Sequence, residues 1–253
     1  MESGLTSYSL LAPWYDQLMA DIPYQRWADF ISFQIRRLGI KKPVIGDLAC
    51  GTGRLAAHLA KQYQVWGIDN CPEMLALATS RLDQGLFLHG TLTDLNQPAD
   101  VFICTCDGVN HILSLKDVVT ILRRVHNLLP IGGLFLFDIN SPHKYSRVLA
   151  DHIFYFPLDQ GGHLIWENMY QNPRSMAKLQ FFLPVKPGLF QRAETLIEER
   201  CYSVATLAYW LQVCGFSLIG LWDDYTLRSI SAKTQRIVFS AVKTNLRSGI
   251  REI

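Results

Sequence analysis

The chain has 253 residues, of which 49% are hydrophobic and 18% are charged. This composition is that of a globular protein with enough apolar side chains for a sizeable core, and it excludes a disordered or collagen-like chain. Lysine and arginine number 24 and aspartate and glutamate 22, so the net charge is only +2. Such a balance does not support a dedicated nucleic-acid-binding surface.

The cysteines and the apolar runs indicate in which redox compartment the protein is expected and whether a membrane span is expected. The six cysteines form no CxxC pair and no secretory leader is recognisable, so we expect free thiols, a reducing cytoplasm and a cytoplasmic protein. Cys104 and Cys106 lie near His111, but no second ligand pair has zinc-like spacing, and we expect no metal. The longest uncharged stretch, 205–222, is interrupted by glycines, so no membrane span is expected.

The first 140 residues alternate between helical and strand patterns. Apolar residues at spacings of three and four over residues 8–38 predict a helical segment that is interrupted near Pro23. Helical patterns also follow residues 55, 72 and 116. Apolar runs predict five strands between them, at 44–49, 64–68, 86–88, 101–105 and 134–140. Because strands that alternate with helices form parallel sheets, we predict an α/β fold with a doubly wound, mostly parallel sheet.

The pattern changes after residue 140. Strand-like stretches at 163–170, 177–184 and 192–202, joined by glycine-containing turns, predict an antiparallel insertion. A helix at 204–214 and strands at 216–222 and 236–242 complete a seven-stranded sheet. We therefore expect a core formed by residues 1–140 and 203–253, with residues 1–40 as a helical cap and 141–202 as a β-rich lid.

The stretch from Asp47 to Gly53, DLACGTG, carries the strongest functional signal. Glycines between a buried strand and a helix let a ligand approach the backbone, which is typical of a nucleotide-type pocket. The glycines also fit the dinucleotide fingerprint, with Asp69 as the ribose carboxylate, so the glycine motif alone leaves NAD open. Asp47 lies four residues before Gly51, and a carboxylate there suits a cationic ligand such as S-adenosylmethionine.

Five stretches of the chain carry a resemblance to a known family. They are Tyr15-Asp16 with Tyr24 and Trp27; Asp47 to Gly53; Gly67-Ile68-Asp69; Cys106 to His111; and Leu128 to Gly133. Together they resemble the class I S-adenosylmethionine-dependent methyltransferases, over residues 8–243. The chain is most similar to a small bacterial branch with a β insertion, which includes amino-sugar and glycine N-methyltransferases and, more distantly, tRNA carboxymethyluridine methyltransferases. The resemblance implies a Rossmann-like methyltransferase fold.

The resemblance implies the residues that hold the cofactor. Gly51 and Gly53 would pass under its methionine part, Asp47 would orient its amino group, and Asp69 would accept hydrogen bonds from both ribose hydroxyls. The full implied set is Tyr15, Tyr24, Trp27, Asp47, Ala49, Cys50, Gly51, Gly53, Asp69, Asn70, Met74, Thr91, Leu92, Cys106 and Asp107. Where relatives commonly read Gly-Asp-Met, this chain has Thr91, so adenine recognition would fall to backbone groups or to Asp94.

Methyl transfer from a sulfonium is an in-line displacement that needs alignment and exclusion of water. His111 is our candidate base, with Asn110 beside it, because its ordinary pKa suits proton removal at neutral pH and it follows the fourth strand. The insertion would add substrate-binding groups, namely Trp166, Glu167, Arg200 and Tyr202. A cap and a lid that both close over the methyl group favour a small molecule with an amine or hydroxyl acceptor.

Other interpretations stay open. His111 could be a satisfied polar group, the cap aromatics could be core, and Arg200 and Glu167 could pair across strands. A tRNA-modifying methyltransferase and a binding protein that keeps S-adenosylmethionine without turnover are the two alternative functions. An NAD-dependent oxidoreductase has no support beyond the glycine turn. A nucleic acid is a less favoured partner than a small molecule, no membrane partner is expected, and the chain would be a monomer or homodimer.

Overall fold

The structure is a computed structural model that describes residues 7–83 and 85–245. The outermost residues of the predicted core, 1–6 and 246–253, lie outside the described residues. A seven-stranded sheet has the strand order β10-β11-β5-β4-β1-β2-β3, and only β11 is antiparallel to its neighbours. The doubly wound, mostly parallel sheet predicted from the sequence is therefore confirmed. Its strands are β1 (Val44–Leu48), β2 (Gln64–Asp69), β3 (Leu86–His89), β4 (Val101–Cys104), β5 (Leu134–Asn140), β10 (Phe216–Asp223) and β11 (Arg236–Lys243).

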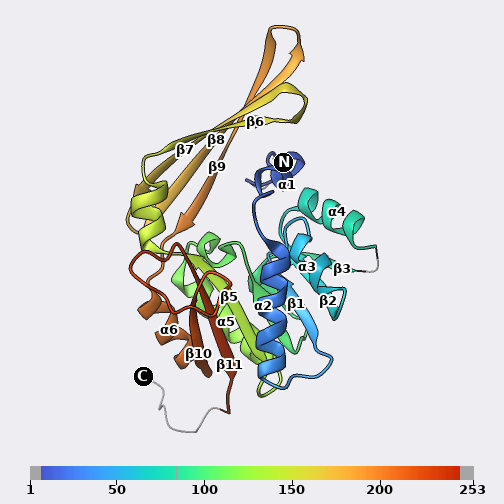
Figure 1. Ribbon diagram of the computed structural model, residues 1–253, viewed down its shortest axis with the longest axis vertical. Coiled ribbons are helices and arrows are strands. Elements are labelled where there is room, and N and C mark those ends of the chain that lie inside the picture. Colours follow the sequence, from blue (N-terminus) through green and yellow to red (C-terminus); the bar gives the residue numbers. More distant parts are fainter. Residues whose placement is uncertain (1–6, 84, 246–253) are drawn as a thin grey trace.

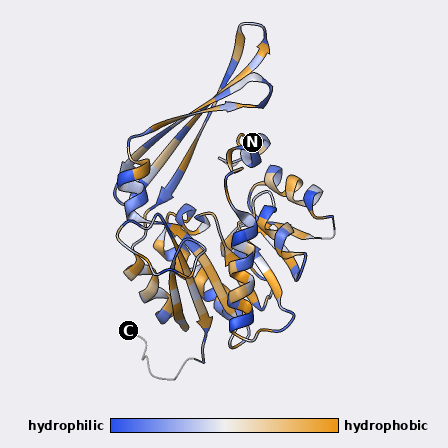
Figure 2. Ribbon diagram, viewed as in Figure 1, coloured by the Kyte–Doolittle hydropathy of each residue, from blue (hydrophilic) through white to orange (hydrophobic). Residues whose placement is uncertain are grey.

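Helices cover both faces of this sheet, because its central strands send alternate side chains to opposite sides. In β5, Phe135 and Phe137 pack with helices α5 and α6, whereas Leu134 and Leu136 pack with α2 and α3. Hydrophobic residues are concentrated in the strands between these layers (Figure 2). The helices are α1 (Ala12–Leu18), α2 (Tyr24–Arg37), α3 (Arg54–Leu59), α4 (Pro72–Arg81), α5 (Leu115–Leu128) and α6 (Val204–Val213).

A second, antiparallel sheet extends away from the first one as a long arm (Figure 1). It contains β6 (Ile153–Leu158), β7 (Gly162–Gln171), β8 (Arg174–Lys186) and β9 (Leu189–Arg200). The prediction of an antiparallel insertion holds, but β6 and the π-helical turn Lys144–Leu149 were not expected. Strands β7 and β8 are also longer than their apolar runs, because pairing along the hairpin extends to its polar ends.

The N-terminal segment lies between the two sheets (Figure 1). Leu11 of this segment is buried against Leu164 and Phe181 of the second sheet, and Trp14 stacks near Phe181. Ala12 of the same helix packs on Met74 of α4. The predicted interruption near Pro23 separates α1 from α2. In the described part of the chain, no helix is both long enough and apolar enough to cross a membrane.

Candidate active site

A cavity of about 500 Å³ opens at the carboxyl ends of β1, β2, β3 and β4, where ligands bind in open α/β sheets. The α1 segment and the edge of β9 complete its wall. Of the residues predicted for the site, ten line this cavity. They are Tyr15, Ala49, Gly51, Asp69, Asn70, Met74, Thr91, Leu92, Cys106 and His111.

The glycine turn joins β1 to α3 with its backbone facing the cavity. Gly51 has a φ of +53°, and a Cβ atom placed on it would meet nothing within 4 Å, so the missing side chain leaves open space. Gly53 has a φ of +71°, and a Cβ atom there would lie 3.0 Å from Ala78 Cβ. The first glycine therefore leaves room for a ligand, and the second lets α3 approach α4.

Two acidic side chains lie beneath this turn. Asp69 accepts backbone hydrogen bonds from Gly51 N (2.8 Å) and Cys71 N (2.9 Å), which fix its carboxylate at the cavity wall. Asp47 is 2% exposed, and its Oδ1 atom has no hydrogen-bond partner among the described residues. Burial, with the nearby charge of Asp69, raises the pKa of Asp47 to about 8. An unpartnered buried carboxyl beside a second carboxylate is suited to a cationic ligand.

The opposite end of the cavity is formed by the residues after β3. Thr91 Oγ1 donates a hydrogen bond to Asp94 Oδ2 (2.5 Å), and Thr93 Oγ1 lies 2.8 Å from Thr91 Oγ1. Thr91 lines the cavity, whereas Asp94 does not. Thr91, the residue at which this sequence departs from the family pattern, therefore lies at the cavity, and Asp94 lies outside its lining.

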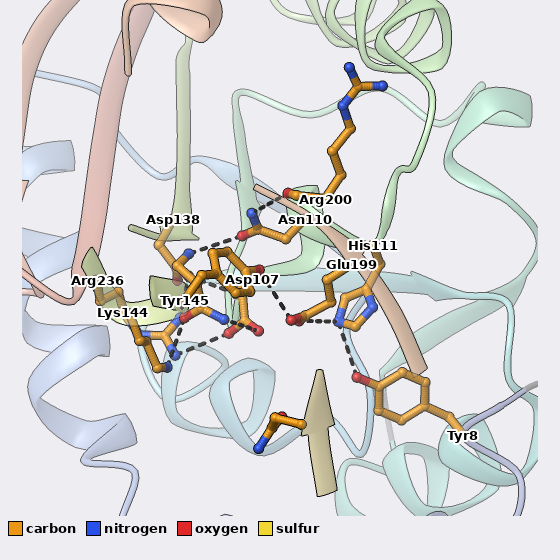
Figure 3. Close-up of polar contacts among 12 residues, drawn as sticks. Tyr8, Asp107, Asn110, His111, Asp138, Lys144, Tyr145, Glu199, Arg200 and Arg236 are labelled. Atoms are coloured by element: carbon orange, nitrogen blue, oxygen red, sulfur yellow. Dashed lines mark hydrogen bonds and ion pairs between the residues drawn. The ribbon is translucent and has the colours of Figure 1, made fainter. Parts of the chain in front are cut away.

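His111 lies between Tyr8 and Glu199 at one end of a polar network beside the cavity (Figure 3). Its Nε2 atom is 3.1 Å from the Tyr8 hydroxyl and 3.4 Å from Glu199 Oε1. Burial lowers the pKa of His111, which keeps the imidazole neutral near pH 7. Tyr8 and Glu199 were not predicted, because Tyr8 falls in a helical apolar pattern and Glu199 in a charged strand pattern.

Behind His111, two cations and two carboxyl groups form a buried ionic cluster. Arg236 Nη2 is 3.0 Å from Asp107 Oδ1, and Arg236 also pairs with Asp138, whose side chain is fully buried. Asn140 Nδ2 donates to Asp107 Oδ2 (2.9 Å), and Lys144 Nζ donates to Asn140 Oδ1 (2.8 Å). Although burial opposes it, the charge of Arg236 holds the pKa of Asp107 well below its usual range.

Asp107, His111 and Glu199 place potential ligand atoms within 4.8 Å of one another, a spacing that a metal ion could span. Both oxygens of Asp107, however, are already engaged by Arg236 and Asn140. A divalent cation there would also face the positive charges of Arg236 and Lys144. We therefore describe the cluster as an ion-pair and hydrogen-bond network and assign no metal ligands.

Two predicted cap residues lie in the core rather than at the cavity. Trp27 is 1% exposed and stacks on Tyr225 at a centroid distance of 4.3 Å, with the Arg236 guanidinium 5.1 Å from its ring. Tyr24 is buried beside Trp27, under the Arg54 guanidinium. Neither residue lines the cavity, because α2 packs its apolar face on the sheet and leaves α1 to cover the site.

Four further predicted residues border the cavity without lining it. Cys50 directs its thiol toward Gly67, Gly53 begins α3, and Asp107 belongs to the buried ionic cluster. Asn110 is fully buried: its Nδ2 donates to the Arg200 carbonyl (2.8 Å), and its Oδ1 accepts from the Asn140 amide (2.9 Å). Asn110 therefore ties β5 to β9 instead of reaching the cavity.

The predicted substrate-binding residues also lie outside the cavity lining. Arg200 Nη1 donates to the Leu113 carbonyl (3.0 Å), and the Tyr202 hydroxyl donates to the Ile112 carbonyl. These two side chains thus hold the 112–113 segment, which does line the cavity. Trp166 donates to Asn168 within its own strand, and Glu167 is half-buried in β7 opposite Lys178.

Comparison with known proteins agrees with this architecture. A methyltransferase domain model matches residues 45–133. A protein of Geobacillus sp. (strain WCH70), named a methyltransferase, is 31% identical over 249 residues, which are 94% of this chain and 100% of that protein. The methyltransferase YqeM of Bacillus subtilis is 30% identical over 94% of this chain and 97% of its own length.

Solved structures lead to the same class. A crystal structure of an S-adenosylmethionine-dependent methyltransferase from Clostridium acetobutylicum is 28% identical, with a TM-score of 0.84, and covers 94% of this chain and 100% of that chain. Fold and site together define a class I S-adenosylmethionine-dependent methyltransferase. The chain belongs to the methyltransferase family represented by the Geobacillus and Bacillus proteins.

The described residues fit S-adenosylmethionine, the cofactor of this class. The orphaned carboxyl oxygen of Asp47 and the anchored carboxylate of Asp69 offer acceptors to a positively charged ligand with ribose hydroxyls. The open space over Gly51 admits a ligand close to the backbone. When bound, the cofactor supplies an electrophilic methyl group on a sulfonium.

Proposed function

We propose that this enzyme transfers the methyl group to an amine or hydroxyl of a small molecule, with His111 as the base. The observation that carries this proposal is the position of His111, which lines the same cavity as Asp69 and Gly51 and is neutral near pH 7. A neutral imidazole can accept a proton from an acceptor that arrives as an ammonium or a hydroxyl.

The charge of the cavity wall favours an amine. Among the described residues that line the cavity there is no lysine or arginine, whereas three are acidic: Asp69, Asp117 and Glu198. Such a wall attracts a cationic acceptor and disfavours a polyanion at the mouth. This distribution supports a small cationic acceptor over tRNA.

We propose that residues 141–202 act as a lid and the α1 segment as a cap over the reacting groups. Leu196 and Glu198 from β9 line one side of the cavity, and Tyr8 and Tyr15 line another. Enclosure of this kind excludes water and holds the acceptor in line with the methyl group. Tyr8 and Tyr15 pack edge to face at 6.2 Å, which gives the cap a preformed aromatic surface.

Two similar proteins whose names give an amino-sugar or sugar N-acceptor are consistent with an amine. A dTDP-3-amino-3,6-dideoxy-alpha-D-glucopyranose N,N-dimethyltransferase of Streptomyces fradiae is 29% identical over 43% of this chain. A sugar N-methyltransferase of Streptoalloteichus, at 16% identity and a TM-score of 0.78, shares the fold across both sheets. We include amino sugars among the first acceptors to test.

The experiment is a methyl-transfer assay with isotope-labelled S-adenosylmethionine, followed by mass spectrometry of three acceptor sets. These are small amines including the dTDP-amino sugar, hydroxylated metabolites and unmodified tRNA. We expect label on a small amine, and a rate reduced by about 10²-fold or more in His111→Ala. His163→Ala is the matched control, because His163 pairs with Tyr155 on the arm and does not line the cavity. Label on tRNA alone, or equal rates in both variants, would refute the proposal.

A further inference from the structure

His111 is contacted by two parts of the chain that are distant from it in sequence. The Tyr8 hydroxyl approaches its Nε2 atom from the N-terminal segment, and the two rings meet edge to face at 5.5 Å. From β9, Glu199 Oε1 lies 3.4 Å from the same nitrogen, and the Glu198 backbone also hydrogen-bonds the imidazole. Asp107 and Asp69 are the other acidic groups close enough to affect its charge. The ring orientation is therefore set by β9 and by the α1 segment.

Glu199 differs from the other carboxyl groups of the network in its partners. Asp107 and Asp138 both pair with Arg236, but among the described residues no lysine or arginine forms an ion pair with Glu199. Its Oε2 atom accepts a hydrogen bond from the Tyr145 hydroxyl at 3.1 Å, and its side chain is 15% exposed. Figure 3 shows Glu199 between Asp107 on one side and His111 on the other. Glu199 is thus a nearly buried acid whose ionic partner is a histidine.

Burial, together with the charge of Asp107, raises the pKa of Glu199 well above its usual range. Asp107 stays ionised because of Arg236, and the two carboxyl groups share a hydrogen bond. The opposite shifts favour one proton and one negative charge on the pair, as expected for adjacent buried acids. Lys144 and Tyr145 are the other polar groups that face the Asp107–Glu199 pair.

We propose that Glu199 is a positioning residue for His111: it orients the imidazole toward Tyr8 and the cavity, and with Asp107 it forms a singly charged carboxyl pair beside the imidazolium. The inference rests on the proposed role of His111 as the base. Strand β9 would then have two roles. It covers the cavity, and it positions the base, which is correctly oriented only when this strand is in place.

The proton step balances as follows. An N–H bond of the acceptor ammonium breaks, its electron pair stays on the nitrogen, and the proton moves to His111 Nε2. The carboxyl pair keeps its one proton and its one negative charge, so that the singly charged pair, with Glu199 nearer the ring, faces the new imidazolium. The total charge of the three groups rises by the one proton taken from the acceptor. The freed nitrogen lone pair is then available for methyl transfer.

The test measures the imidazole directly and needs no acceptor. Long-range proton–nitrogen NMR spectra of the ¹⁵N-labelled protein report the tautomer and pKa of each histidine, and His111→Gln identifies the His111 signals. In the wild type we expect His111 to have a protonated Nδ1 and an unprotonated Nε2. In Glu199→Gln the pKa of His111 should fall by about one unit or more, because the negative charge of the pair is then confined to Asp107 beside Arg236 and cannot be shared by the group nearer the imidazolium.

Two further variants make the result specific. Glu199→Asp keeps the charge at a longer distance, so the pKa of His111 should lie between those of the wild type and Glu199→Gln. Glu194→Gln is the matched control: Glu194 lies on the same strand, pairs with exposed Arg192 and Lys178, and should leave His111 unchanged. Binding of S-adenosylhomocysteine checks that each variant is folded. If Glu199→Gln does not fold, the pKa of His111 in Glu199→Asp decides the test.

An unchanged pKa and tautomer of His111 in the folded Glu199 variants would overturn the inference. That outcome is distinct from failure of the proposed function, which would appear as absent methyl transfer in the wild type. If methyl transfer is established, kcat for an amine should fall in Glu199→Gln with little change in KM for S-adenosylmethionine. A fall in kcat without a shift in the His111 pKa would also contradict the positioning role.

Discussion

Asp16 Oδ1 accepts a hydrogen bond of 2.7 Å from Thr52 Oγ1, which joins the α1 segment to the glycine turn. The same aspartate forms an ion pair with Arg81 from α4. Arg54, the first residue of α3, adds hydrogen bonds to the Asp16 and Met19 carbonyls. The segment that covers the cavity is therefore fastened to the turn that forms its floor.

This link predicts an effect on cofactor affinity. Asp16→Ala removes the acceptor of Thr52 and the partner of Arg81, so the covering segment should close less firmly. Because hydrogen bonds to charged groups contribute about 1.5–3 kcal/mol, we expect S-adenosylhomocysteine affinity to fall about tenfold or more in calorimetric titrations. Asp21→Ala, at an exposed position of the same segment, is the control. Equal affinities in the two variants would show that the covering segment does not depend on Asp16.

Asp47 predicts an unusual dependence of stability on pH. Its pKa is about 8 in the folded protein, well above the ordinary value of an aspartate, so the folded state binds the proton more tightly than the unfolded state. The stabilising effect of this proton is complete below about pH 4 and is lost as the pH rises toward 8. Asp47→Asn should remove this loss and raise the free energy of unfolding at pH 8 by about 1 kcal/mol or more.

The same substitution should weaken binding of S-adenosylmethionine, because the amide cannot ionise to match a cation. Denaturant unfolding at pH 5 and pH 8, without ligand, tests the stability effect, and calorimetric titration tests the binding effect. A variant whose stability relative to the wild type is the same at both pH values would contradict the raised pKa of Asp47.

Arg236 is expected to be the most sensitive position of the ionic cluster. Its guanidinium pairs with Asp107 and with the fully buried Asp138, which also accepts a hydrogen bond from Tyr225 (2.5 Å). Arg236→Met leaves two buried carboxylates without their cation, which should cost about 3–5 kcal/mol in the free energy of unfolding. Arg192→Met, at an exposed pair on the arm, should cost less than about 1 kcal/mol. Urea unfolding of both variants measures the contrast, and similar losses would show that burial does not govern these pairs.

The two glycines of the turn should respond differently to alanine. At Gly53 the added methyl group meets Ala78 at 3.0 Å in a left-handed backbone, so Gly53→Ala should lower stability by about 1–3 kcal/mol. At Gly51 the methyl group enters open space beside the cavity, so Gly51→Ala should cost only about 1 kcal/mol but reduce cofactor affinity. Thermal unfolding and calorimetric titration separate the two effects. Loss of affinity in Gly53→Ala alone would contradict the assignment of Gly51 to the ligand side.

Much of the fold follows from local patterns in the sequence. The apolar runs, the glycine turn and the helical spacings predicted the strands of the parallel sheet, since each pattern depends on residues within a few positions of one another. Asp69 and Gly51 are brought together by the parallel pairing of β1 and β2 within one strand–helix–strand unit. Strand β6 was not predicted, because its side chains are mostly exposed or half-buried and its position depends on pairing with β7.

The alternation of short patterns by itself determined the class of sheet, and the resemblance carried by the motifs indicated the cofactor, S-adenosylmethionine. Only the tertiary structure decided that Trp27 belongs to the core, that Arg200 and Tyr202 hold the 112–113 segment, and that Tyr8 and Glu199 meet at His111. Tyr8 and His111 are 103 residues apart in the chain. Contacts over such separations depend on how α1 and the second sheet pack on the core, and that packing leaves no periodic signal in the sequence.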